Sequence, residues 1–126
     1  MRLKVTERES AGVSIVEFSG RITLGAETAL MRDTILELIK QGRKAIVVDL
    51  SQVSHIDSTG IGELVSVAQT IRQKGGDLKL LNLTKKLRDM VEVVKLGTIF
   101  ELFDDESAAV NSFSQSQEPG PAARAS

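Results

Sequence analysis

The chain has 126 residues and a formal net charge of −1, with 41% hydrophobic, 26% charged and 3% aromatic residues. This length suffices for one domain, and the composition is that of an ordinary soluble globular protein. Lysine and arginine are spread along the chain and aromatic residues are few, which argues against nucleic acid as a partner. Cysteine is absent, so disulfides, thiol catalysis and cysteine-based metal sites are excluded. No apolar run approaches the length of a membrane span or a signal-peptide core, so we expect a cytoplasmic protein without a membrane partner.

The first third of the chain predicts a β-hairpin and a helix. Residues 3–9 and 13–19 each alternate apolar and polar side chains as strands do, and Ala11-Gly12 fits a short turn between them. The second predicted strand ends at Gly20. After a loop, apolar residues recur at helical spacing from Ala26 to Lys40.

Two strand–helix units follow. The apolar run 45–50 is typical of a buried strand, and a helix with one apolar face follows over residues 61–71. Residues 77–82 predict a third strand of the same kind, and Thr84 is placed to cap a helix that ends before Gly97.

The last elements are shorter. Residues 98–103 fit an edge strand and residues 104–113 an amphipathic helix. From about Ser114 the chain is too polar and too rich in Pro, Gly and Ser to pack, so we expect a domain over residues 1–113 and a disordered tail over 114–126. Strands joined through crossover helices run parallel, so the fold class is α/β, with a mixed sheet of about four or five strands, an N-terminal hairpin and about four helices.

The most informative stretch is His-Ile-Asp-Ser-Thr-Gly-Ile-Gly, residues 55–62, between a predicted strand and a predicted helix. Asp57, Ser58 and Thr59 are residue types that accept hydrogen bonds from the unpaired N–H groups of a first helical turn. The stretch is therefore explained by a helix cap alone. A second interpretation is that Ser58 is a switch, because a phosphate at a helix N-terminus lies at the positive end of the helix dipole and leaves the fold intact. Gly60 and Gly62 would let a partner or a phosphate approach the backbone there.

The sequence offers little for catalysis or metal binding. His55 is the one histidine, and it precedes Ser58 by three residues with no Gly-x-Ser-x-Gly motif around them. No metal-ligand spacing, P-loop or dinucleotide-binding motif is present. Asp49 follows a strand-like run as the phosphorylated aspartate of a receiver domain does. The acidic cluster that a receiver domain needs is missing, so we interpret Asp49 as a turn-forming strand end. We expect no enzyme, no cofactor and no metal.

Four segments of the chain form a pattern when taken together. They are Val16-Glu17-Phe18-Ser19-Gly20-Arg21-Ile22, Val47-Val48-Asp49-Leu50-Ser51, Ile56-Asp57-Ser58-Thr59-Gly60-Ile61-Gly62 and Gly75-Gly76-Asp77-Leu78-Lys79-Leu80. This pattern resembles the STAS family, and within it the small stand-alone anti-sigma factor antagonists of bacteria. The resemblance covers about residues 3–113 and is most specific in Asp57-Ser58-Thr59-Gly60-Ile61-Gly62.

The resemblance implies a phosphorylation-controlled regulator. An unphosphorylated antagonist of this kind binds an anti-sigma factor that is also a serine kinase, and so frees a sigma factor for transcription. The kinase phosphorylates the serine after the motif's aspartate, which is Ser58 here, and a PP2C-type phosphatase reverses the modification. The partner-binding residues that the resemblance implies are Thr23, Asp57, Ser58, Thr59, Gly60, Ile61 and Gly62.

The chain departs from the family pattern at two positions. Thr23 stands where many antagonists carry an aspartate, and His55 stands where an apolar or aromatic residue is common. Thr59 is a second hydroxyl beside Ser58, so it is the alternative phosphate acceptor.

Two other functions remain open from the sequence. The chain could be an accessory or scaffold subunit of this fold, for example of a lipid ABC transporter or a stress-signalling assembly, with Ser58 in a structural role. It could also bind a small ligand or nucleotide at the helix N-terminus. The sequence does not decide whether two copies form a homodimer.

Overall fold

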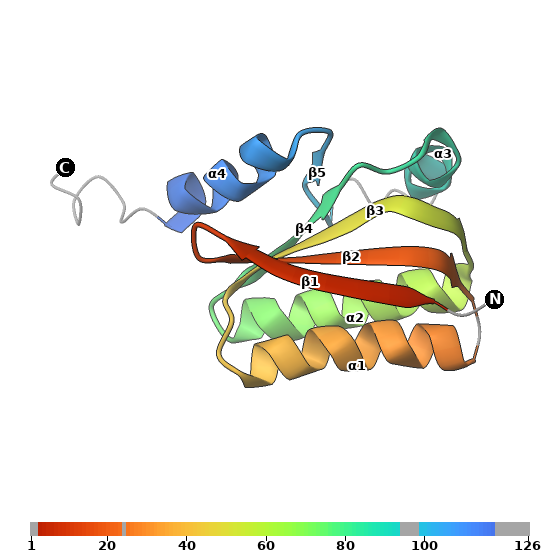
Figure 1. Ribbon diagram of the computed structural model, residues 1–126, viewed down its shortest axis with the longest axis horizontal. Coiled ribbons are helices and arrows are strands. Elements are labelled where there is room, and N and C mark those ends of the chain that lie inside the picture. Colours follow the sequence, from red (N-terminus) through yellow and green to blue (C-terminus); the bar gives the residue numbers. More distant parts are fainter. Residues whose placement is uncertain (1–2, 24, 94–98, 118–126) are drawn as a thin grey trace, which may run out of the picture.

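The computed structural model describes residues 3–23, 25–93 and 99–117. Strands and helices alternate along most of this length after an initial hairpin (Figure 1). The elements are β1 (Lys4–Ser10), β2 (Val13–Ile22), α1 (Ala26–Lys40), β3 (Ala45–Ile56), α2 (Ser58–Gln73), β4 (Asp77–Leu81), α3 (Lys85–Val93), β5 (Leu102–Phe103) and α4 (Glu106–Gln117).

The strands of the described residues form one mixed sheet in the order β1-β2-β3-β4-β5. The pair β1 and β2 is antiparallel and the other pairs are parallel, which confirms the predicted mixed α/β fold with its N-terminal hairpin. The hairpin turns at Ala11 and Gly12, where both residues have positive φ values of 52° and 81°. Two successive positive φ values match the right-handed twist of the flanking strands.

Helices cover both faces of the sheet. In Figure 1, α1 and α2 lie side by side against one face, and α4 lies on the opposite side. The larger apolar core lies under α1 and α2 and includes Phe18, Met31, Ile46 and Ile71. A smaller core under α4 includes Ile15, Val47, Ala109 and Phe113.

Two strands are longer than the sequence predicts. β2 does not end at Gly20 but continues to Ile22, and β3 does not end at Leu50 but continues to Ile56. The pairing of β2 with β3 shifts register twice and continues to Ile22 and Ile56. Polar residues near the ends of these strands, which suggest a loop in the sequence, therefore still pair between the two strands. Asp49 is consequently not a strand end, as predicted, but a buried residue within β3 whose carboxylate accepts a hydrogen bond from the Ser51 N–H.

The C-terminal part differs from the prediction at its boundaries. The edge strand is confirmed next to β4 but comprises only Leu102 and Phe103, while the predicted starting residue 98 and the helix-ending Gly97 lie outside the described residues. Helix α4 continues past Ser114 to Gln117. Residues 118–126 of the predicted tail also lie outside the described part of the chain.

Candidate functional site

The amino end of α2 is held by Asp57. Its carboxylate accepts a hydrogen bond from the Gly60 N–H at 2.8 Å, and its backbone is extended, as at a helix N-cap. Its N–H also donates to the Ile22 carbonyl at 3.2 Å, so the start of α2 is tied to the end of β2. The cap predicted for this stretch is therefore confirmed, and Asp57 provides it.

Ser58 and Thr59 open the helix, and both are exposed. Neither hydroxyl makes a hydrogen bond within the described part of the chain, because the carboxylate of Asp57 already occupies the capping position. The first turn of α2 contains no acidic residue. Both residues are thus exposed, and their hydroxyls hold no structural contact among the described residues.

The two glycines of the motif have different surroundings. Gly62 is exposed, and a Cβ on it would meet no atom within 4 Å. Gly60 is buried, and a Cβ there would lie 2.8 Å from the Ile22 carbonyl oxygen and 2.8 Å from Cγ1 of Ile56. Glycine at position 60 thus allows α2 to pack closely on the ends of β2 and β3, whereas the sequence suggested a backbone opened to a ligand. Ile61 beside it is half-buried.

Thr23 follows the end of β2 next to this helix start. Its side chain is half-buried, and its carbonyl accepts a hydrogen bond from the Thr28 hydroxyl at 2.5 Å. Because Ile22 bonds to Asp57, Thr23 is placed at the same end of the molecule as Ser58. The structure therefore brings the predicted partner-binding residues 23 and 57–62 to one edge.

Among the described residues, the His55 side chain makes a hydrogen-bond contact with Ser54 and none with Ser58. His55 lies in β3 with Nδ1 at 3.3 Å from the Ser54 hydroxyl oxygen. Arg21 and Lys86 contribute positive charge around it, and the charge of Lys86, followed by that of Arg21, lowers the pKa of His55 below its usual 6.5. No group of three or more potential ligands from His, Asp and Glu gathers into a metal site within the described residues. Among these residues, no helix is long and apolar enough to cross a membrane.

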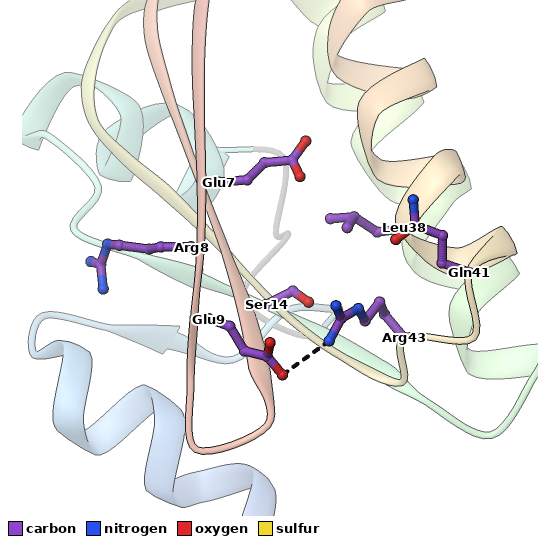
Figure 2. A pocket seen from close by; sticks show the side chains of 7 residues that line it. All are labelled: Glu7, Arg8, Glu9, Ser14, Leu38, Gln41 and Arg43. Atoms are coloured by element: carbon purple, nitrogen blue, oxygen red, sulfur yellow. Dashed lines mark hydrogen bonds and ion pairs between the residues drawn. The ribbon is translucent and has the colours of Figure 1, made fainter.

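A hollow of about 200 Å³ lies at the opposite end of the molecule, between β1 and the carboxyl end of α1 (Figure 2). Its lining is mostly polar and charged, and an ion pair of 3.0 Å between Arg43 Nη1 and a Glu9 carboxylate oxygen crosses it. It contains none of the residues that the sequence singles out.

Comparison with known proteins identifies the family. The model of the STAS domain matches residues 4–109. The chain belongs to the STAS domain family. It is 32% identical over 102 residues to an anti-sigma-B factor antagonist of Listeria monocytogenes. The matched region covers 79% of this chain and 86% of that protein.

Solved structures share the STAS fold. An anti-sigma factor antagonist from Mycobacterium paratuberculosis matches with a TM-score of 0.77 at 21% identity, over 89% of this chain and 94% of that one. The phosphorylated form of the Bacillus cell fate determinant SpoIIAA matches with a TM-score of 0.67 at 19% identity, over 86% of this chain and 98% of that one. At these identities the likeness establishes the fold.

Two residues at this edge of the STAS domain were missed by sequence reasoning. Arg21 is the register partner of His55 across β2 and β3, and Lys86 lies in the first turn of α3. Arg21 could have been found by extending β2 beyond Gly20. Lys86 has no local signal, because only the folded chain brings α3 to His55.

Proposed function

We propose that the chain is an anti-sigma factor antagonist whose binding is controlled by phosphorylation of Ser58. In its unphosphorylated form it binds an anti-sigma factor that is also a serine kinase, and so frees a sigma factor. Phosphorylation of Ser58 by this kinase ends the binding, and a PP2C-type phosphatase restores it. The chain acts as a cytoplasmic regulator and substrate, without catalysis of its own.

The observation that carries this proposal is the different structural role of Asp57 and Ser58 at the start of α2. Asp57 caps the helix, and the Ser58 hydroxyl is exposed and makes no hydrogen bond within the described residues. A serine needed only as a cap would accept a hydrogen bond from the first turn. Ser58 does not, so its hydroxyl has no structural role that phosphorylation would disturb.

The position also suits a phosphate. A phosphoserine carries about −1.5 to −2 charges at neutral pH, and negative charge is favourable in the first turn of a helix. The first turn of α2 contains no acidic residue, and the carboxylate of the preceding Asp57 accepts a hydrogen bond from the Gly60 N–H. The domain can therefore accept the modification while the surface that a partner meets changes sharply in charge.

The names of relatives support the same function. The Listeria monocytogenes relative is an anti-sigma-B factor antagonist, and SpoIIAA, which shares the fold, has been solved in a phosphorylated form. The motif Asp57-Ser58-Thr59-Gly60 supplies the residues through which this chain would work in that way.

The test is to mix the full chain with a candidate anti-sigma kinase from the same genome and ATP, and to measure intact mass with fragment mapping. We expect one phosphate, on Ser58, that is absent from Ser58→Ala and present in the matched variant Thr59→Val. The phosphorylated chain should no longer bind the kinase. Phosphate on Thr59 alone would move the switch by one residue, and neither binding nor phosphate with any such kinase would contradict the proposal.

A further inference from the structure

Three basic residues from three elements lie in one region beside the start of α2: Arg21 of β2, His55 of β3 and Lys86 of α3. Arg21 and His55 are register partners in neighbouring strands. Lys86 is close enough that its charge, with that of Arg21, lowers the pKa of His55. We call these three side chains the basic surface.

Within the described residues, the side chains of Arg21 and Lys86 make no hydrogen bond and no ion pair with a carboxylate. The carboxylate of Asp89, on the same helix as Lys86, pairs instead with Lys85 at 3.3 Å. Other arginines of the fold do form ion pairs: Arg43 with Glu9, Arg72 with Asp77, and Arg88 with Asp104.

The arrangement is unfavourable for the isolated domain. Lys85 and Lys86 occupy the first turn of α3, which contains no acidic residue, and positive charge is destabilising at that end of a helix dipole. Like charges gathered around His55 add repulsion, as its lowered pKa reflects. An anion supplied from outside the domain would relieve both effects.

The basic surface borders the phosphorylation site. Ser58 follows His55 by three residues, so their Cα atoms are at most about 11 Å apart. Arg21 precedes Ile22, whose carbonyl accepts the hydrogen bond from the Asp57 N–H. A phosphate on Ser58 would therefore lie at the same end of the sheet as Arg21 and His55, and its Cα separation from His55 is at most a little more than the Debye length of about 8 Å at physiological salt.

We propose that Arg21, His55 and Lys86 form a docking surface for a carboxylate-rich segment of the partner protein. This inference rests on the proposed function for the existence of that partner. Complementary charge speeds association and selects among partners, and an acidic segment is the partner chemistry that these unpaired cations fit. Phosphorylation of Ser58 would add about as much negative charge as Arg21 and Lys86 carry, and so release the segment by cancelling its attraction.

The test uses the full unphosphorylated chain and a hexaglutamate peptide at low salt, followed by NMR. His55 is the one histidine of the chain, so its ring protons give a single titration curve. We expect the peptide to raise the pKa of His55 and to shift the backbone amide signals of Arg21, His55 and Lys86. No kinase is needed, so this result is independent of whether a kinase acts on Ser58.

Matched variants separate docking from general attraction of charge. Arg21→Gln and Lys86→Gln should each weaken peptide binding by about two- to five-fold, the range for one exposed ion pair. Lys40→Gln removes the same charge from the last turn of α1, away from the site, and should leave binding unchanged. A chain carrying phosphoserine at position 58 should lose the response. An unchanged His55 titration curve, equal weakening by Lys40→Gln, or full binding by the phosphorylated chain would overturn the proposal.

Discussion

At the scale of single residues, Gly60 and Gly62 differ in the space that their surroundings leave for a side chain. In Gly60→Ala the new Cβ would contact the Ile22 carbonyl oxygen and the Ile56 side chain at 2.8 Å, closer than nonbonded atoms allow. We expect the free energy of unfolding to fall by about 1–3 kcal/mol, the usual cost of overpacking. Urea denaturation followed by circular dichroism measures this.

Gly62→Ala is the control for this prediction. Position 62 is also in α2, but its Cβ would meet nothing within 4 Å. Alanine should therefore stabilise the helix by about 0.5–1 kcal/mol through its better helix propensity. Equal effects of both substitutions would show that helix propensity, and not the contact with β2, decides the outcome.

Residue types alone predict the helix caps but not the surroundings of the motif. Asp57 and Thr84 both accept the hydrogen bonds expected of N-caps, because capping depends on the few residues that follow in the chain. The packing of Gly60 against Ile22 and the approach of Lys86 to His55 depend on elements distant in sequence. Such contacts leave no local pattern to recognise.

At the scale of elements, the position of Ser58 in the first turn of α2 determines how the domain tolerates a negative charge there. In Ser58→Glu a carboxylate enters the first turn, where the helix dipole favours it. We expect the free energy of unfolding to stay the same or to rise by about 0.3–1 kcal/mol. Ser66→Glu, at an exposed position in the middle of the same helix, should show no such gain. A loss above about 1 kcal/mol in Ser58→Glu would mean that the added charge disturbs the fold.

Helix α4 is fixed to the sheet by a lysine that sequence reasoning did not single out. Lys79 of β4 is fully buried, and its ammonium group donates to the Ser112 hydroxyl at 2.8 Å and pairs with Glu101 at 2.9 Å. It also lies 4.4 Å from the centre of the Phe113 ring. The sequence pattern predicts a buried strand over residues 77–82 but does not identify partners for a lysine within it. Only the return of α4 across the sheet buries it.

We expect Lys79→Ala to lower the free energy of unfolding by about 2–4 kcal/mol, because it removes the buried stem and the contacts to Ser112 and Phe113. Lys79→Met keeps much of the volume and should cost less. Hydrogen exchange should show faster opening of α4 in Lys79→Ala than in Lys79→Met. If the amides of α4 exchanged at the wild-type rate in both variants, Lys79 would not anchor α4 to the sheet.

At the scale of the whole molecule, an ion pair joins β1 to α4, the first and last of the described elements. Arg8 of β1 donates through Nη1 to Oε2 of Glu106 at 2.8 Å, and its Nη2 donates to the other carboxylate oxygen. Alternation and helix periodicity predict both elements separately. They cannot predict the contact, because 98 positions separate the two residues.

This ion pair predicts how stability depends on pH. The hydrogen bond from Arg8 lowers the pKa of Glu106 below its usual 4.5, so the folded state holds this proton less tightly than the unfolded state. The contribution of the Arg8–Glu106 ion pair to the free energy of unfolding is therefore complete above pH 4.5. It is lost as the pH falls through the pKa of Glu106 in the folded state. Because both side chains are more than a third exposed, we expect it to remain below about 1 kcal/mol.

The measurement is urea denaturation of wild type and Glu106→Gln between pH 7 and pH 3. The variant should be less stable than wild type at pH 7, and the difference should shrink as Glu106 becomes protonated in the wild type. Glu7→Gln, an exposed carboxylate on the same strand as Arg8, should not remove this pH dependence. A difference between wild type and Glu106→Gln that stays constant with pH would mean that the side chain stabilises α4 by packing, and that the bridge from β1 contributes no charge-dependent stability.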